Sequence, residues 1–387
     1  MSGIYIHIPF CRRACHYCNF HFSTSLALKM DLVAAILKEI EMAAPLTMQL
    51  KTRVEESAYL KSKKIETVYF GGGTPSLLTE QELGDILHKI NMHFEVDPRA
   101  EITLEANPDD VTVESLKVWK ATGINRLSIG VQSFFDEDLR WMNRAHNALQ
   151  AMHSIQSAQQ AGFDNISIDL IYGGPTLTDS QWEENVRLAI QAGVPHLSCY
   201  ALTVEPSTPL YKMIRRNKRS DVDADKQATQ FLLLIDWLEA AGFEHYEISN
   251  FARPGKRSLH NSGYWQGHTY LGLGPSAHSF DGRSRQWNVS NNTVYIQSLK
   301  NNRIPAETEL LTVTQMMNEY IMTSLRTKEG LELNHITRNF GDAFSSEIKH
   351  DAGKYLDDGR LLDTGGVLQL SRLGKLYADG IAADLFR

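Results

Sequence analysis

Residues 5–18 read YIHIPFCRRACHYC and join a short apolar strand directly to a loop that carries three cysteines. The spacing Cys-x3-Cys-x2-Cys places Cys11, Cys15 and Cys18 within eight residues, although the whole chain has only four cysteines. Three thiolates from one tight loop can hold three irons of a cubane 4Fe-4S cluster and leave the fourth iron open to another ligand. The spacing therefore predicts an iron-sulfur cluster with one open iron.

Zinc is the main alternative for these thiolates, and unrelated cysteines are a third interpretation. Structural zinc takes four ligands in paired spacings. His7, His16 and His21 are the nearby side chains that could complete such a set. Cys199 stands in an apolar run and is expected to be a small buried side chain rather than a ligand. Spacing alone leaves these three alternatives open.

Short apolar runs of strand length recur along the first half of the chain, with helical patterns between them. The runs are 5–9, 67–70, 101–105, 126–131, 166–171 and 197–202, and the helical patterns are 29–43, 80–90, 113–121, 148–161 and 179–192. Strands that are apolar on both faces and joined by helices favour a parallel sheet. Glycines and polar residues follow these runs, at the rim where barrels carry their sites. The pattern therefore predicts an α/β fold, a partial (β/α)6 TIM-type barrel, over a doubly wound sheet.

The last part of the chain has a different pattern. Helical patterns at 313–326, 333–340 and 345–358 precede two short strands at 361–363 and 367–370 and a final helix. This order predicts a small C-terminal winged-helix-like domain, a shape that does not by itself imply DNA binding. The expected division is 1–225 for the barrel, 226–304 for the remainder of the main region and 305–387 for the C-terminal domain.

Composition narrows the class of protein. A chain of 387 residues with 42% hydrophobic content can bury a large core. The formal net charge of -7 gives no overall basic field, so no nucleic-acid partner is expected. The N-terminus shows no signal-peptide pattern, and no apolar stretch approaches the roughly 18 residues that span a bilayer. These features predict a cytoplasmic protein.

Five motifs extend the cysteine pattern to a family. In chain order they are YIHIPFCRRACHYC, GGGTPS, EANPDD, IGVQSF and IDLIYGGP. They resemble the coproporphyrinogen III oxidase-like branch of the radical S-adenosylmethionine (SAM) superfamily, and the resemblance covers nearly the whole chain. It implies a 4Fe-4S cluster on the three clustered cysteines, with SAM on the open iron. It also implies that one electron cleaves SAM to a 5'-deoxyadenosyl radical, chemistry that belongs to the cofactors.

The resemblance also implies a SAM site along the barrel rim. Glu105 suits the SAM ammonium and Arg144 its carboxylate through a bidentate fork, whereas Gln132 and Asp169 suit the ribose hydroxyls. The expected SAM residues are Tyr5, Gly71, Gly72, Gly73, Thr74, Glu105, Gln132, Arg144, Asp169 and Ala201. Residues 272–279, GLGPSAHS, are interpreted as a further rim loop that places His278 near SAM.

Two features distinguish branches within the family. Porphyrin-oxidising members resemble Cys-x3-Cys-x2-Cys-x-Cys behind an N-terminal extension, whereas here Phe20 takes the last position and ten residues precede Cys11. The segment HNSGYW at 260–265 resembles the HNxxYW motif of the HemW branch of heme chaperones. That resemblance implies His260 as axial heme ligand, with Tyr264 and Trp265 as walls of the heme site. Without it, a histidine beside aromatics is more often a packed loop residue.

The sequence thus predicts a heme chaperone that binds a 4Fe-4S cluster, SAM and heme and passes heme to respiratory or storage apo-hemoproteins. Its electron donor is not identified, and the prediction leaves open whether the protein is also an enzyme. The alternatives are an oxygen-independent coproporphyrinogen III dehydrogenase and, less favoured, a radical SAM RNA-modifying enzyme. The basic run 212–219 is either a solvated face or a contact for phosphates and peripheral membrane association.

Overall fold

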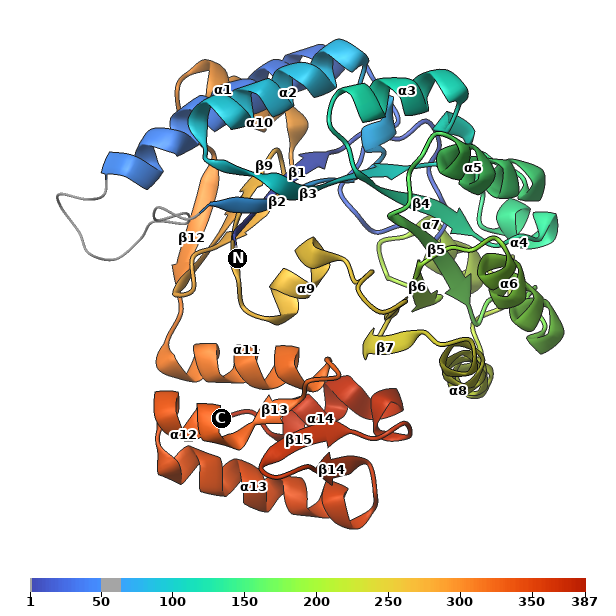
Figure 1. Cartoon of the computed structure of the whole chain (residues 1–387), viewed down its shortest axis with the longest axis vertical. Coiled ribbons are helices and arrows are strands. Elements are labelled where there is room, and N and C mark those ends of the chain that lie inside the picture. The colour runs from blue at the N-terminus through green and yellow to red at the C-terminus, as the bar shows by residue number, and fades with distance from the viewer. Residues whose placement is uncertain (1, 50–63) are drawn as a thin grey trace.

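The computed structural model describes residues 2–49 and 64–387, so residues 1 and 50–63 of the predicted barrel region lie outside it (Figure 1). Six parallel strands follow one another in both sequence and sheet order. They are β1 (Ser2–Ile8), β2 (Ile65–Gly72), β3 (Val96–Ala106), β4 (Arg126–Gln132), β5 (Ile166–Tyr172) and β6 (His196–Ala201). The predicted partial (β/α)6 barrel is confirmed in this arrangement.

Helices cover the outer face of these strands (Figure 1). They are α1 (Lys29–Gln49), α2 (Glu80–His93), α3 (Val113–Ala121), α4 (Asp136–Trp141), α5 (Ala148–Gln160) and α6 (Asp179–Gln191), followed by α8 (Ala224–Ala240). Several begin at capping boxes, in which the Thr79, Thr112 or Thr178 side chain accepts from the backbone amide three residues later. Such caps satisfy amides that a helix start leaves without partners, so local sequence defines where these helices begin.

The sheet continues beyond the six predicted strands at both edges. On one side β9 (Thr269–Leu273) pairs parallel with β1 and leads to β10 (His278–Phe280), β11 (Ser284–Asn288) and β12 (Ala306–Leu310). On the other side β8 (Asn250–Ala252) and β7 (Glu244–Glu247) extend β6 in antiparallel pairing. None of these short strands was predicted. The interpretation of residues 272–279 as one rim loop is wrong, because its two ends lie in β9 and β10.

A first hydrophobic core lies between the sheet and its helices, and the region after the barrel contributes to it. Phe231 and Leu234 of α8 pack into this core, as do Tyr295 and Ile296 of α10 (Asn292–Lys300). Residues 226–304 therefore pack as part of the barrel body. The predicted domain boundaries themselves stay predictions.

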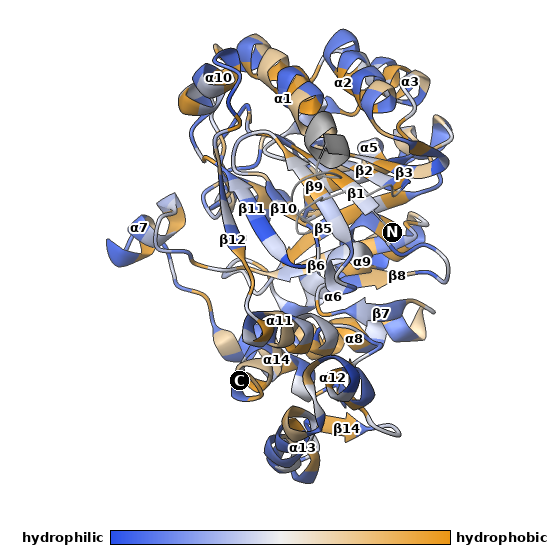
Figure 2. Ribbon diagram, turned by 90° about the vertical axis from the view of Figure 1, so that its left-hand side faces the viewer, coloured by the Kyte–Doolittle hydropathy of each residue, from blue (hydrophilic) through white to orange (hydrophobic). Residues whose placement is uncertain are grey.

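The C-terminal region has its own core. It consists of α11 (Val313–Leu325), α12 (Leu333–Phe340), α13 (Asp342–Asp357), α14 (Ala378–Asp384) and a sheet in the order β13 (Leu331–Glu332), β15 (Val367–Leu370), β14 (Leu361–Asp363). Figure 2 shows mainly hydrophilic residues along α13, on the outside of this domain. The helices and the small antiparallel sheet match the winged-helix-like pattern.

Two short helices lie in different parts of the barrel body. Helix α9 (Leu259–Trp265) contacts β1, β2 and α11, and it lies between the barrel and the C-terminal domain (Figure 1). Helix α7 (Pro209–Arg215) projects from the body (Figure 2) and carries the start of the basic run. No helix among the described residues is long and apolar enough to cross a membrane.

Candidate cofactor site

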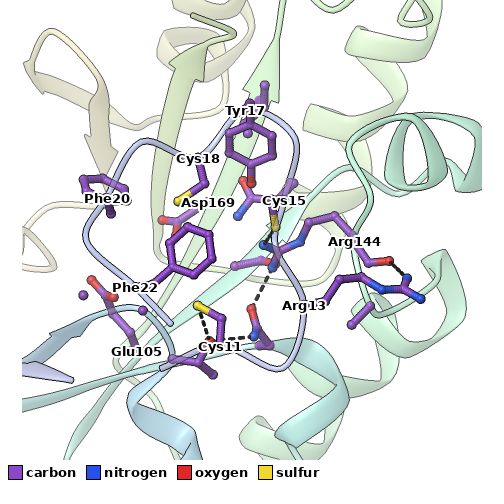
Figure 3. A pocket seen from close by; sticks show the side chains of 18 of the residues that line it. Cys11, Arg13, Cys15, Tyr17, Cys18, Phe20, Phe22, Glu105, Arg144 and Asp169 are labelled. Carbon is purple, nitrogen blue, oxygen red and sulfur yellow. Dashed lines mark hydrogen bonds between the residues drawn. The ribbon is translucent and has the colours of Figure 1, made fainter. Parts of the chain in front are cut away.

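A cavity of about 400 Å³ opens at the carboxyl ends of the parallel strands. Its walls are the loop after β1 and the ends of β2 to β6, which is where barrels assemble their sites. Cys11, Cys15 and Cys18 line it together with every predicted SAM residue except Tyr5 and Gly71. Figure 3 shows the cysteine side chains around the same space as Glu105, Asp169 and Arg144. The tertiary structure therefore gathers most of the predicted cofactor residues in one cavity.

The cysteine loop is held in place from outside the loop. Asn143 Nδ2 donates to the Ala14 carbonyl at 2.8 Å, and the His16 amide donates to the Met142 carbonyl at 3.1 Å. Two side chains donate hydrogen bonds to the sulfurs. The buried Thr74 Oγ1 lies 3.4 Å from Cys11 Sγ, and a guanidinium nitrogen of the half-buried Arg144 lies 3.2 Å from Cys15 Sγ. Hydrogen bonds to cluster sulfurs tune the potential of an iron-sulfur centre.

Burial and these donors act on the thiols in opposite directions. Burial raises the pKa of Cys11 to about 11, although the Thr74 hydroxyl favours the thiolate. Iron takes thiolates as ligands, so metal binding at this loop would release protons. The donors beside Cys11 and Cys15 would stabilise the negative charge of thiolates that bind iron.

The histidines that a zinc site would need face other partners. His7 Nε2 donates to the His21 carbonyl at 3.0 Å, His21 Nε2 lies 2.8 Å from Asn292 Oδ1, and His16 Nδ1 lies 3.0 Å from the Trp141 carbonyl. Across the part of the chain that the structure describes, no three His, Cys, Asp or Glu side chains are grouped for a single metal ion. A zinc site completed by one of these histidines would have to replace the hydrogen bond that its ring nitrogen makes.

Two carboxylates line the wall of the cavity on the barrel side. Burial raises the pKa of Glu105 to about 7, and the nearby Asp169 charge adds to the rise. Burial also raises the pKa of Asp169 to about 6, opposed by a hydrogen bond from Ser198. Tyr69 donates its hydroxyl to Glu105 at 2.8 Å and so positions that carboxylate. A bound ammonium or ribose hydroxyl would find buried acceptors here.

The contacts of Arg144 differ from those that its predicted role requires. Besides Cys15, its guanidinium donates to Asn107 Oδ1 and to the Gly130 carbonyl, both at 2.8 Å. A bidentate pairing with the SAM carboxylate would have to replace these contacts. The arrangement instead places a half-buried cation beside Cys15, where it would offset the negative charge of a thiolate. Its role as SAM carboxylate partner stays a prediction.

Backbone conformation shapes the other rim positions. Gln132 has φ +68°, in the left-handed region that non-glycine residues rarely adopt, and β4 shifts register at this point. Gly73 permits a close approach, because an added Cβ would lie 2.7 Å from the Phe10 carbonyl oxygen. The strained backbone of Gln132 and the absent side chain of Gly73 therefore both contribute to the shape of the cavity.

Some predicted residues lie outside the cavity lining, and some residues that line the cavity were not predicted. Gly71 and Tyr5 lie beneath the cavity, where an added Cβ on Gly71 would be 2.9 Å from the Tyr5 ring. Tyr17, Phe22 and Ser128 line the cavity without having been predicted. Ser128 could have been found from its period-2 spacing with Gln132 on β4, but the two loop aromatics carry no such signal. His278 is absent from the lining and packs near Trp287 instead.

The HNSGYW segment forms α9 at the opposite end of the barrel. His260 is 4% exposed, with Nδ1 at 2.8 Å from Thr67 Oγ1 and Nε2 at 2.9 Å from the Tyr264 hydroxyl. Burial lowers the pKa of His260 to about 3, and Arg126 adds to the fall, so the imidazole is neutral. The adjoining hollow measures only about 10 Å³. The structure thus separates this motif from the cysteine cavity.

Glu101 anchors α9 to the strands. Its carboxylate accepts from the backbone amides of Leu259 at 3.0 Å and His260 at 3.1 Å. Trp265, at the other end of α9, lies under the Arg326 guanidinium of the C-terminal domain, 5.1 Å from the ring centroid. The Tyr69 ring stacks on His260 with centroids 5.0 Å apart, while its hydroxyl bonds Glu105 at the cavity. One tyrosine therefore touches both regions.

Comparison with known proteins identifies the family. Residues 5–189 match the Radical SAM superfamily, and residues 311–377 match the HemN C-terminal domain. The heme chaperone HemW of Mycobacterium tuberculosis is 35% identical to this chain over 99% of the chain and 94% of its own length. The chain belongs to the HemW family. HemW of Bacillus subtilis is 30% identical over 98% of both chains. Membership in the radical SAM superfamily implies a 4Fe-4S cluster and SAM.

A solved structure supports the fold of this HemW-family chain. Coproporphyrinogen III oxidase (HemN) from Escherichia coli, described as a radical SAM enzyme, aligns with a TM-score of 0.83 over 100% of this chain and 90% of its own. The two are 22% identical. This likeness establishes the shared architecture, barrel and C-terminal domain together, and leaves the activity to be argued from the site.

Proposed function

We propose that this chain is a heme chaperone that carries radical SAM cofactors and delivers heme to apo-hemoproteins. The observation that carries the proposal is full-length kinship with proteins named heme chaperone HemW, at 35% identity over 94% of one of them. The HNSGYW segment agrees with it. Phe20, which takes the position of the extra cysteine of porphyrin oxidisers, is 69% exposed at the mouth of the cavity. The respiratory or storage acceptors, the electron donor and a cytoplasmic location stay predictions.

The cysteine cavity fits a cluster with SAM. We assign Cys11, Cys15 and Cys18 to the irons, because their sulfurs face one cavity and receive hydrogen bonds from Thr74 and Arg144. When bound, the cluster would supply the electron that cleaves SAM. Glu105 and Asp169 would receive the ammonium and ribose ends of SAM, and Gly72 and Gly73 at the end of β2 leave room for its amino-acid portion.

The α9 region offers a suitable ligand for heme iron, but the hollow beside that ligand is too small for heme. A neutral imidazole is an ordinary axial ligand, so His260 remains our proposed ligand, although its Nε2 contacts the Tyr264 hydroxyl in this structure. A hollow of about 10 Å³ holds one water and no macrocycle. Heme binding at His260 therefore requires α9, or the Tyr264 and Trp265 side chains, to move from the positions seen here.

The test is an anaerobic heme titration of the cluster-loaded protein, followed by absorbance, with coproporphyrinogen turnover measured on the same sample. We expect stoichiometric heme binding without turnover, and strong loss of binding in His260→Ala. The matched control is His153→Ala, which removes an exposed histidine of α5. Unchanged heme affinity in His260→Ala would remove His260 as the ligand.

The alternative function is an oxygen-independent coproporphyrinogen III dehydrogenase. The match of residues 311–377 to the HemN C-terminal domain is the observation that favours it. Turnover of coproporphyrinogen with little heme binding would establish this alternative and overturn the chaperone proposal. SAM-dependent labelling of RNA would instead revive the RNA-modifying alternative, for which the structure offers no separate support.

A further inference from the structure

A run of cations lies on α7 and in the turn that follows this helix, and we call it the α7 basic surface. It comprises Lys212, Arg215, Arg216, Lys218 and Arg219. All except the half-buried Arg219 are exposed, and α7 projects from the barrel body (Figure 2). No acidic residue stands among them, although the whole chain has a formal net charge of -7. Their positive charge is thus a local feature of the molecule.

The chain does not neutralise the α7 basic surface by itself. Within the part of the chain that the structure describes, none of the five cations makes an ion pair. The acids that follow them in sequence bond backbone amides instead. Asp221 Oδ1 accepts from Val222 at 2.8 Å, and Asp223 Oδ1 accepts from Asp225 at 3.0 Å. The surface can therefore meet an acidic partner without first breaking an internal ion pair.

The α7 basic surface is joined to the cysteine loop next to Cys15. The Leu210 amide, at the start of α7, donates to the His16 carbonyl at 2.8 Å. The Arg219 guanidinium lies over the Trp141 ring, 5.3 Å from its centroid, and the Trp141 carbonyl lies 3.0 Å from His16 Nδ1. His16 is not part of the cavity lining, whereas Cys15 is. The surface thus approaches Cys15 from outside the cavity.

Arg13 adds a further exposed cation within the cysteine loop itself. Its guanidinium donates to the Arg144 carbonyl at 2.8 Å, while Arg219 lies over the Trp141 ring. Residues 141–144 therefore contact both cations. The positive charge of the loop and that of α7 meet on this segment.

The cluster assigned to Cys11, Cys15 and Cys18 needs one electron before SAM can be cleaved, and the inference rests on this proposed cofactor assignment. Electron transfer slows steeply with distance, so the redox group of a donor must come close to the cysteine loop. Brief contacts between redox proteins bury little area and rely on complementary charge for fast association. We propose that the α7 basic surface, together with Arg13, docks an acidic electron-transfer protein that carries a flavin or an iron-sulfur group. The group on the donor loses one electron, and the cluster gains it.

An anionic membrane is the other partner that a run of cations contacts in proteins. Helices that lie in a membrane interface also insert an apolar face. The apolar side chains of α7 instead pack inward, where Leu210 and Ile214 form a small cluster with Tyr17 and Trp141. None of the large hydrophobic side chains of residues 203–222 is exposed. The structure therefore favours a protein partner over a lipid surface.

The first test measures docking of two acidic probes, a plant-type 2Fe-2S ferredoxin and a flavodoxin-type protein that carries FMN. The charge-reversal variant is Lys212→Glu/Arg216→Glu. Its matched control is Lys117→Glu/Lys349→Glu, which makes the same charge change at exposed positions of α3 and α13. At low ionic strength, charge reversal should slow association of the cluster-loaded protein with a probe about tenfold or more, and the control should stay close to wild type. The difference should shrink in about 1 M salt, where charges are screened beyond roughly 3 Å.

The second test follows reduction of the cluster by visible absorbance after rapid mixing with the reduced probe. Charge reversal should lower the rate of this reduction about tenfold. Photoreduced 5-deazariboflavin, a small neutral reductant that needs no docking surface, should reduce the cluster equally in wild type, variant and control. Iron content and circular dichroism should also be equal in the three proteins, because the replaced side chains are exposed.

The outcomes separate this inference from the cofactor assignment. If 5-deazariboflavin reduces no cluster in the wild-type protein, the assignment fails and the inference fails with it. If it does, but neither probe docks, or charge reversal behaves like the control, the assignment stands and the inference is overturned. Charge reversal that abolishes binding to phosphatidylserine vesicles and leaves both probes unaffected identifies a membrane contact and also overturns it. Slower docking and slower reduction in the charge-reversal variant alone support the inference.

Discussion

Replacing Glu101 by leucine should destabilise the barrel where α9 packs against its strands. Glu101 is 6% exposed and Arg126 is 1% exposed, with Arg126 Nε 3.8 Å from a Glu101 carboxylate oxygen. The Arg126 guanidinium nitrogens have no hydrogen-bond partner among the described residues, and Glu101 lies nearer to them than the other carboxylates that Arg126 acts on, Glu105 and Asp169. The Glu101 carboxylate also accepts the first two amides of α9. Its loss would leave a buried cation unpaired and α9 without its anchor.

The magnitude follows from these contacts. Removing one member of a buried ion pair costs about 3–5 kcal/mol, a large share of a typical stability of roughly 5–15 kcal/mol. The double variant Glu101→Leu/Arg126→Met removes the buried cation as well. It should therefore lose only about 1–3 kcal/mol of stability, because the Leu259 and His260 amides are left without an acceptor. Arg126→Met alone should cost less than Glu101→Leu, because the two amides still satisfy Glu101.

Urea unfolding of the four proteins in one double-mutant cycle measures these differences, and hydrogen exchange locates them. Exchange should rise first at the amides of Leu259 and His260 in the Glu101→Leu variant. The reasoning would be refuted if Glu101→Leu stayed within about 1 kcal/mol of wild type, or if the double variant were as unstable as the sum of the single ones.

Three further predictions follow from other parts of the structure. Cys15→Ser should lose the cluster, as read from iron content and visible absorbance, and a full iron complement would defeat the assignment. Burial raises the pKa of Glu39 to about 7 from an ordinary 4.5. The folded state therefore binds the proton more tightly, so the free energy of unfolding should fall by on the order of 3 kcal/mol as pH rises from 4.5 to 7. Glu39→Gln should remove that slope, and an unchanged slope in urea unfolding would contradict the prediction. Gln132→Gly should relieve the strain at φ +68° and stabilise the protein by about 1 kcal/mol while weakening SAM binding; a destabilised variant with unchanged SAM affinity would argue against this role.

Elements that depend on neighbouring residues could be predicted well. The expected helices at 113–121 and 333–340 and the strands at 361–363 and 367–370 coincide with α3, α12, β14 and β15. Their signals are apolar periodicity, caps and a glycine turn, all within a few residues. Strand β11 could not be predicted, because a polar segment such as Ser284–Asn288 becomes a strand only when a sheet edge offers it a partner.

The features of the candidate sites also divide into those that sequence could predict and those that it could not. Sequence alone determined the cysteine spacing, the glycines at the end of β2 and the polar residues at strand ends, because these signals lie within single segments. Only the tertiary structure decided that Arg144 contacts Cys15, that Glu101 anchors α9 and that His260 lies at the far end of the barrel between Thr67 and Tyr264. Thr67 and Glu101 are 193 and 159 residues from His260 in the chain. Such contacts follow from strand order and register, which no local pattern records.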